Sequence, residues 1–135
     1  MMSFWVMGRL VKVPIEVVDS FISTTLTNRP FWLHGKWLRK SEVERYLKGD
    51  VDHDLLDRIG EYILMYNENI MFSTYLLHLS WNKKEKEKYR KWALEGLKEL
   101  REIYKEIKDC RDLNRKYELT KRLLHKSLDL GIDPF

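Results

Sequence analysis

The sequence is poor in several residues that usually mark particular classes of protein. It contains no glutamine, one alanine (Ala93), one cysteine (Cys110) and three prolines. A lone cysteine excludes an internal disulfide, which favours a reducing, cytoplasmic environment. Abundant lysine, glutamate and arginine without glutamine are typical of hyperthermophile proteins. We therefore expect a hyperthermophilic source, and a small protein with so few motifs would suit an archaeal virus or plasmid.

Long apolar runs are also missing. The nearest candidate for a membrane span, residues 69–82, contains asparagine, serine, threonine and histidine. It is shorter than the roughly 18 apolar residues that crossing a bilayer requires. Charged residues from Arg9 onward interrupt the N-terminal region, so a secretory signal is not expected either. The sequence therefore predicts no transmembrane segment, while peripheral contact with a membrane surface stays open.

The residues that are present favour one folded domain. The 135 residues are 44% hydrophobic and 34% charged, which separates the chain from disordered and from membrane proteins. This length is enough to bury one core. No internal repeat or linker divides the chain, so we predict a single helical-bundle domain over residues 1–135.

Apolar residues recur at steps of three and four in residues 52–81, in two stripes that lie side by side. Such a broad apolar face is typical of a helix in the middle of a bundle. Asp50 or Asp52 can cap its start. The stripes are Leu56, Ile59, Ile63, Tyr66, Ile70 and Leu77, and Leu55, Tyr62, Met65, Phe72, Leu76 and Leu79.

In residues 82–109 apolar residues recur with the same period on one face. Asn82 and Glu85 form a capping-box pattern at the start of this helix. Because almost no residues separate this helix from the previous one, the two must fold back as an antiparallel hairpin. The sequence therefore predicts an all-α antiparallel bundle of about four helices, with helices 52–81 and 82–109 at its centre.

The remaining elements are shorter. A third helix is predicted from about residue 112 to just before Gly131, and a fourth over residues 15–26 behind Pro14. Ser41 and Glu44 form a second capping-box pattern, which predicts a short helical turn over residues 41–47. Residues 2–13 are irregular or short strands, with Gly8 as a candidate turn.

Positive charge is unevenly distributed along the chain, whose net charge is +4. Residues 83–92 and 111–126 each contain six bases and two acids. In an antiparallel bundle, the start of the second long helix lies at the same end as the finish of the last helix, which predicts one basic pole. This pole would bind phosphates of nucleic acid without reading bases, or would be a solvated helix end. Its predicted residues are Lys83, Lys84, Lys86, Lys88, Arg90, Lys91, Lys121, Arg122 and Lys126.

Aromatic and basic residues alternate in residues 28–40. Such a segment can stack on nucleotides or lie at a membrane interface, but large aromatics can equally close the end of a bundle core. The residues predicted for this aromatic and basic surface are Arg29, Trp32, Lys36, Trp37 and Arg39.

Nothing in the sequence indicates a catalytic or metal site. The four histidines, His34, His53, His78 and His125, are isolated from one another, without the short spacing of paired metal ligands. No nucleophile motif, phosphate loop or dinucleotide fingerprint is present. We therefore predict a protein that is not an enzyme and has no cofactor.

These observations favour an interaction or assembly protein. The partner would be another protein or a second copy of the chain, because the apolar stripes are too broad for a two-helix hairpin. The alternative is a nucleic-acid-binding accessory protein that uses the basic pole.

Overall fold

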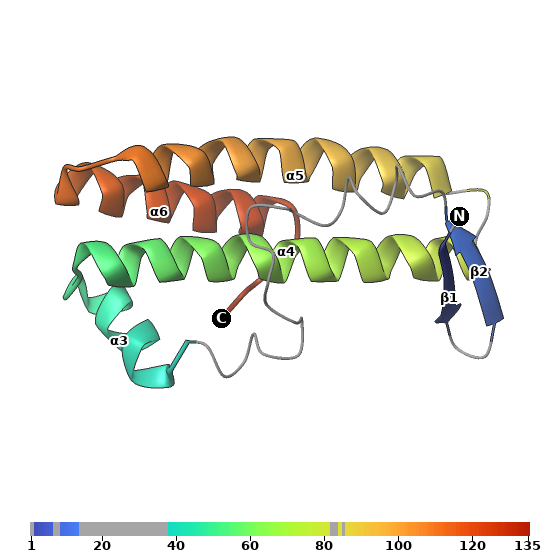
Figure 1. The fold of residues 1–135 in the computed structure, drawn as a ribbon, viewed down its shortest axis with the longest axis horizontal. Coiled ribbons are helices and arrows are strands. Elements are labelled where there is room, and N and C mark those ends of the chain that lie inside the picture. The colour runs from blue at the N-terminus through green and yellow to red at the C-terminus, as the bar shows by residue number, and fades with distance from the viewer. Residues whose placement is uncertain (1, 7–8, 14–37, 82–83, 85) are drawn as a thin grey trace.

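The computed structural model describes residues 2–6, 9–13, 38–81, 84 and 86–135. Helices α4 and α5 run antiparallel along the molecule, and α6 lies beside them over part of their length (Figure 1). The predicted all-α bundle with a central hairpin is confirmed. The elements are β1 (Met2–Val6), β2 (Arg9–Val13), α3 (Lys40–Lys48), α4 (His53–Trp81), α5 (Lys86–Asp109) and α6 (Leu113–Asp129).

The core lies between α4 and α5, where the predicted stripes meet. Ile59 and Ile63 of α4 and Leu97 and Leu100 of α5 are completely buried. The two backbones approach closely at Gly60, since a Cβ atom there would lie 3.4 Å from the side chains of Tyr104 and Ile107. Asp52 caps α4 as predicted, its carboxylate accepting the Leu55 backbone N–H at 2.7 Å.

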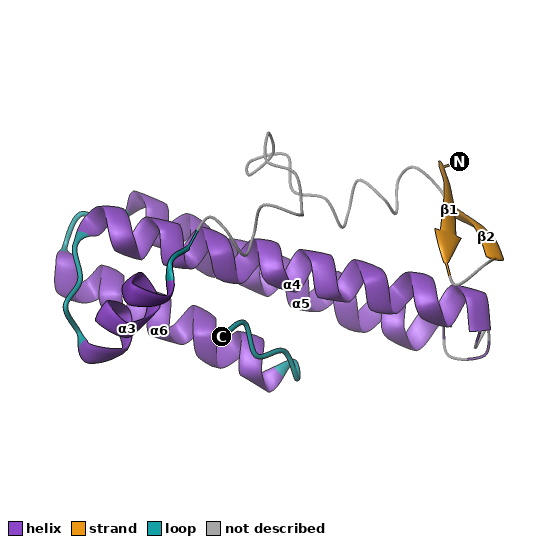
Figure 2. Cartoon of the chain, turned by 90° about the horizontal axis from the view of Figure 1, so that it is seen from below, coloured by secondary structure: helices purple, strands orange, loops and turns teal. Residues whose placement is uncertain are grey.

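Helix α6 forms the third side of the bundle and agrees with the helix predicted from about residue 112. After it, Gly131 takes a left-handed φ of 85°, and the chain turns back (Figure 2). The Ser127 hydroxyl donates to the carbonyl of Ile132 at 2.7 Å, and the Tyr62 hydroxyl of α4 donates to the carbonyl of Pro134 at 2.8 Å. The last residues are thereby held against α6 and α4.

Helix α3 differs from the turn predicted over residues 41–47. It begins at Lys40, and the Glu42 carboxylate accepts the Arg39 backbone N–H at 3.2 Å. The predicted cap at Ser41 is wrong, because Ser41 lies inside the first turn of the helix. The residue whose side chain caps α3 is Glu42, three residues after the N-cap residue Arg39. Gly49 ends α3 with a φ of 82°.

The N-terminal residues form an antiparallel two-stranded ribbon, with Phe4 opposite Val11 and Val6 opposite Arg9. The alternative of short strands is therefore the correct one for this segment. The ribbon contacts α4 at the end of the bundle away from α3 (Figure 1). The helix predicted over residues 15–26 and the cap predicted at Asn82 lie outside the described residues.

Buried polar groups connect α6 to α4. The Lys116 ammonium of α6, whose side chain is 4% exposed, donates to Asp57 of α4 at 2.8 Å. The Asn67 amide donates both to the Ile63 carbonyl and to the Ser127 hydroxyl at 2.8 Å. Because an unpaired buried polar group is costly, these contacts favour one alignment of α6 against α4.

Candidate interaction surface on helix α5

The residues predicted to form one basic pole do not come together. Helix α6 has 17 residues and α5 has 24, or about 26 Å and 36 Å at 1.5 Å per residue. The chain leaves α6 level with Gly96, where an added Cβ would lie 3.0 Å from the Leu130 side chain. Lys121, Arg122 and Lys126 therefore lie beside the middle of α5 and not beside its first turns. The predicted single pole is wrong because α6 is too short to reach the start of α5.

The bases at the start of α5 form a separate group. Lys84, Lys88 and Lys91 are exposed, while Arg90 is 41% exposed and lies 3.6 Å from Glu87. Lys91 lies 4.0 Å from Glu95. Of the other residues predicted here, Lys83 and the side chain of Lys86 lie outside the described residues. The charge of this group is therefore only partly offset by carboxylates of the same helix.

Aromatic rings beside this group pack on one another across the α4–α5 seam. The rings of His78 and Tyr89 stack with centroids 3.5 Å apart, and Trp92 meets Tyr89 edge-on at 6.1 Å. The Lys88 ammonium lies 5.8 Å from the Tyr89 ring. These half-buried rings already have ring partners, so they hold the end of the hairpin together and do not present an open stacking surface.

The aromatic and basic surface predicted near residue 30 is not described, apart from one member. Arg29, Trp32, Lys36 and Trp37 lie outside the described residues. Arg39 is exposed and stands immediately before α3.

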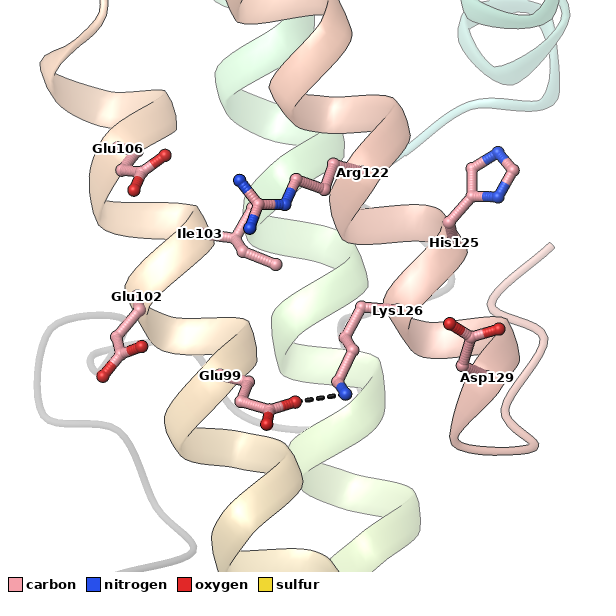
Figure 3. A pocket seen from close by; sticks show the side chains of 8 residues that line it. All are labelled: Glu99, Glu102, Ile103, Glu106, Arg122, His125, Lys126 and Asp129. Carbon is pink, nitrogen blue, oxygen red and sulfur yellow. Dashed lines mark ion pairs between the residues drawn. The ribbon is translucent and has the colours of Figure 1, made fainter.

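One flank of α5 has acidic residues at steps of four and three, a heptad spacing. We call these residues the acidic row, and it faces α6: Glu99 forms an ion pair with Lys126, and Arg122 extends toward α5 (Figure 3). An open groove of about 480 Å³ separates the two helices here. Two members of the acidic row are thus ion-paired within the described residues, Glu99 with Lys126 of α6 and Glu95 with Lys91 of α5 itself. Its members are Glu95, Glu99, Glu102, Glu106 and Asp109.

A neighbouring face of α5 has basic residues at steps of three and four, and Glu102 of the acidic row borders the grooves along both sets. We call this set the basic row; it extends about 26 Å along the helix. A second groove of about 510 Å³ lies along it, lined by Leu94, Lys98, Arg101, Glu102 and Lys105. The members of the basic row are Lys91, Leu94, Lys98, Arg101, Lys105 and Lys108.

Only part of the basic row is neutralised within the described residues. Arg101 lies 3.3 Å from the buried carboxylate of Glu68 on α4, which holds the middle of the row in place. Lys98 and Lys105 are exposed and have no carboxylate within ion-pair distance in the described part of the chain. The Lys108 ammonium lies 5.6 Å from the Tyr104 ring. Two lysines one heptad apart are therefore available to an external anion.

Sequence reasoning identified the start of α5 but missed Lys98, Arg101, Lys105 and Lys108. Charge was counted over residues 83–92 and 111–126, and these four residues lie between the two segments, where acids and bases alternate. A helical projection would have found them, since bases recur with the heptad period on one side and acids on the other.

Several groups with shifted pKa lie elsewhere, where α3 meets α4, and burial also raises the pKa of Tyr62 and Tyr75 farther along α4. The Arg58 guanidinium holds the pKa of the Glu42 carboxyl below its ordinary value. The backbone N–H of Leu55, helped by Arg45, does the same for Asp52. Burial raises the pKa of Tyr46, which is 2% exposed. Helix capping and packing account for each of these shifts.

The described residues contain no group of three or more histidine, cysteine, aspartate or glutamate side chains that could hold a metal ion. None of the described helices is long and apolar enough to span a membrane. His53 and His78 lie near opposite ends of α4, His125 is on the outer side of α6 (Figure 3), and His34 lies outside the described residues.

The fold and its charged surfaces define a helical bundle with two oppositely charged flanks on one helix. No protein-family model matches the chain, and no curated protein or solved structure is significantly similar to it.

Proposed function

We propose that this protein is a non-enzymatic interaction protein that binds an acidic protein partner through the basic row of α5. The observation that carries the proposal is a pair of exposed lysines, Lys98 and Lys105, that have no carboxylate within ion-pair distance among the described residues. They stand on either side of Arg101, which the buried Glu68 carboxylate holds in place. A row of fixed positive charge of this kind attracts an acidic surface and orients it.

A different partner is favoured over a second copy of the chain. The large apolar side chains that are well exposed among the described residues lie on β2, α3, α4, α6 and the C-terminal tail, and so do not line one helix face. A symmetric interface would need such residues gathered in one self-complementary patch. These side chains are Leu10, Leu47, Leu77, Leu128 and Phe135. The proposal therefore expects a light-scattering mass of one protomer, and a stable dimer would favour self-association instead.

The binding test uses poly-L-glutamate as an acidic polypeptide probe and the double variant Lys98→Glu/Lys105→Glu. We expect wild-type protein to bind the probe at about 50 mM salt and to lose affinity at about 200 mM. The variant should bind about tenfold more weakly, because each reversal replaces an attraction by a repulsion. Fluorescence anisotropy with labelled probe measures both effects.

The matched control is Lys40→Glu/Lys48→Glu, which makes the same charge change at two exposed sites on α3, away from the basic row. It should bind within about twofold of wild type, since long-range charge is screened. Equal losses in both variants would mean that net charge and not the basic row governs binding, and this result would overturn the proposal.

Nucleic-acid binding is the second candidate, and the exposed bases Lys84, Lys88 and Lys91 favour it. A short DNA duplex serves as the probe in the same titration. This alternative predicts that Lys84→Glu/Lys88→Glu abolishes duplex binding while Lys98→Glu/Lys105→Glu leaves most of it, because phosphate binding would centre on the start of α5. Duplex binding without polyglutamate binding would replace the first proposal by this one.

Two expectations, about the source of the protein and its cellular compartment, are part of the same proposal. The composition supports a hyperthermophilic source and a reducing cellular compartment for such an interaction protein.

A further inference from the structure

The basic row has the spacing of a surface that another helix packs against. Its members follow one another at steps of three, four, three, four and three residues. On a straight helix a heptad row drifts by about 20° per seven residues, so a second helix can follow it when the two axes cross at about 20°.

The same helix already shows this mode of docking on its other flank. The acidic row has the same heptad period, and α6 lies along it with Lys126 paired to Glu99 and Arg122 beside the groove (Figure 3). Ile103, which is 8% exposed, lies under that groove and supplies apolar contact between the charged side chains. One charged flank of α5 is thus a working example of helix docking within this chain.

The basic row repeats these features with the opposite sign. Leu94 is the apolar member of the row and lies in the wall of its groove with Lys98 and Lys105. Arg101 is held by the Glu68 carboxylate, whose side chain is 5% exposed, so the centre of the row is fixed by the bundle before any partner arrives. A prearranged row of this kind loses less side-chain entropy on binding than mobile lysines would.

We infer that the partner of the basic row is an amphipathic α-helix that carries glutamate or aspartate at heptad spacing and lies along α5 as α6 does on the other flank. This inference rests on the proposed function and specifies the partner's form. Acidic side chains of the docked helix would meet Lys98 and Lys105, and an apolar side chain between them would contact Leu94. The charge complementarity of the row commits the site to an acidic helix, and the light-scattering mass distinguishes a separate partner from a second copy of this chain.

Two peptides of about three heptads test the inference with the full-length protein. Both have the same composition and equal helical content by circular dichroism. One places its glutamates in a single heptad row with a leucine between them, and the other distributes them around the helix. We expect the heptad peptide to bind about tenfold more tightly at about 50 mM salt, because only it can satisfy several lysines together.

Variants then locate the binding site. Lys98→Glu/Lys105→Glu should weaken heptad-peptide binding about tenfold, and Lys40→Glu/Lys48→Glu should change it less than about twofold. Leu94→Ser should weaken the heptad peptide and leave polyglutamate binding unchanged, which a purely electrostatic surface would not predict. Circular dichroism confirms that each variant keeps its helix content.

The outcomes separate this inference from the broader proposal. Equal affinity for the two peptides, together with polyglutamate binding that Lys98→Glu/Lys105→Glu weakens, would overturn the helix inference and keep the basic row as a binding surface. Absence of binding to all three probes would overturn both. Heptad-peptide binding that survives the Lys98→Glu/Lys105→Glu change would place the peptide elsewhere and also refute the inference.

Discussion

The two charged rows of α5 have the same period and opposite sign, and in the described structure each reaches another helix through one ion pair, Glu99 with Lys126 of α6 and Arg101 with Glu68 of α4. They differ in what lies beside them. The groove along the acidic row is also lined by Arg122 and Lys126 of α6, whereas the described residues that line the groove along the basic row all belong to α5. The difference shows that one helix can use one charged side for its own fold while keeping another for a partner. The net charge of the chain conceals both sides.

The largest expected effect concerns the apolar side of α5, which faces the core. Leu100→Ala should lower the free energy of unfolding by about 3 kcal/mol, because Leu100 is completely buried and its loss leaves a cavity. Leu94→Ala, on the half-buried edge of the basic row, should cost less than about 1 kcal/mol. Urea denaturation measures both values. Similar losses would show that the basic row is part of the core.

An intermediate effect compares the flanks directly. Glu99→Lys should lower the free energy of unfolding by about 1 kcal/mol, because it removes the partner of Lys126 and places a second cation beside it. Lys98→Glu, one residue earlier and in the basic row, should change stability by no more than about 0.5 kcal/mol. The same denaturation experiment tests the pair. If both changes destabilise the protein equally, the two flanks do not differ as we describe.

The smallest effect is a pH dependence that arises away from both rows, at the junction of α3 and α4. The pKa values of Glu42 and Asp52 are lowered from their ordinary values of 4.5 and 3.8. Their contribution to stability is therefore complete above the ordinary pKa and is lost as pH falls through the lowered pKa. Thermal unfolding midpoints should decrease over this acidic range, and less steeply in Glu42→Gln/Asp52→Asn. An equally steep decrease in the double variant would assign the pH dependence to other carboxylates.

The sequence predicted the long helices because apolar periodicity reports directly on buried faces. The stripes that include Ile59 and Ile63 identified α4, and Asp52 marked its start correctly. The start of α3 was misplaced because the sequence pattern placed the cap at Ser41 with Glu44, whereas the structure pairs Arg39 with Glu42. Only the observed contact from the Arg39 backbone to Glu42 distinguishes the two pairs.

The candidate site was harder to predict because it depends both on the lengths of α5 and α6 and on the side of α5 on which each charged residue lies. The position of Leu130 beside Gly96 decides which bases of α6 lie near which part of α5, and no local pattern contains that information. The basic row itself was visible in the sequence as a heptad period. It was missed because charge was counted over residues 83–92 and 111–126, and Lys98 and Lys105 lie between these two segments. The interaction function and the hyperthermophilic source remain predictions.

The lone thiol of Cys110 follows directly after α5, two residues beyond Lys108, and is partly exposed. Because it is the single cysteine of the chain, maleimide chemistry would attach one nitroxide or fluorophore at a defined end of the basic row without any engineered mutation. Paramagnetic broadening or energy transfer from that label would then report which terminus of a docked helix lies nearest to it. The chain thus supplies its own spectroscopic reference point for the polarity of a bound helix.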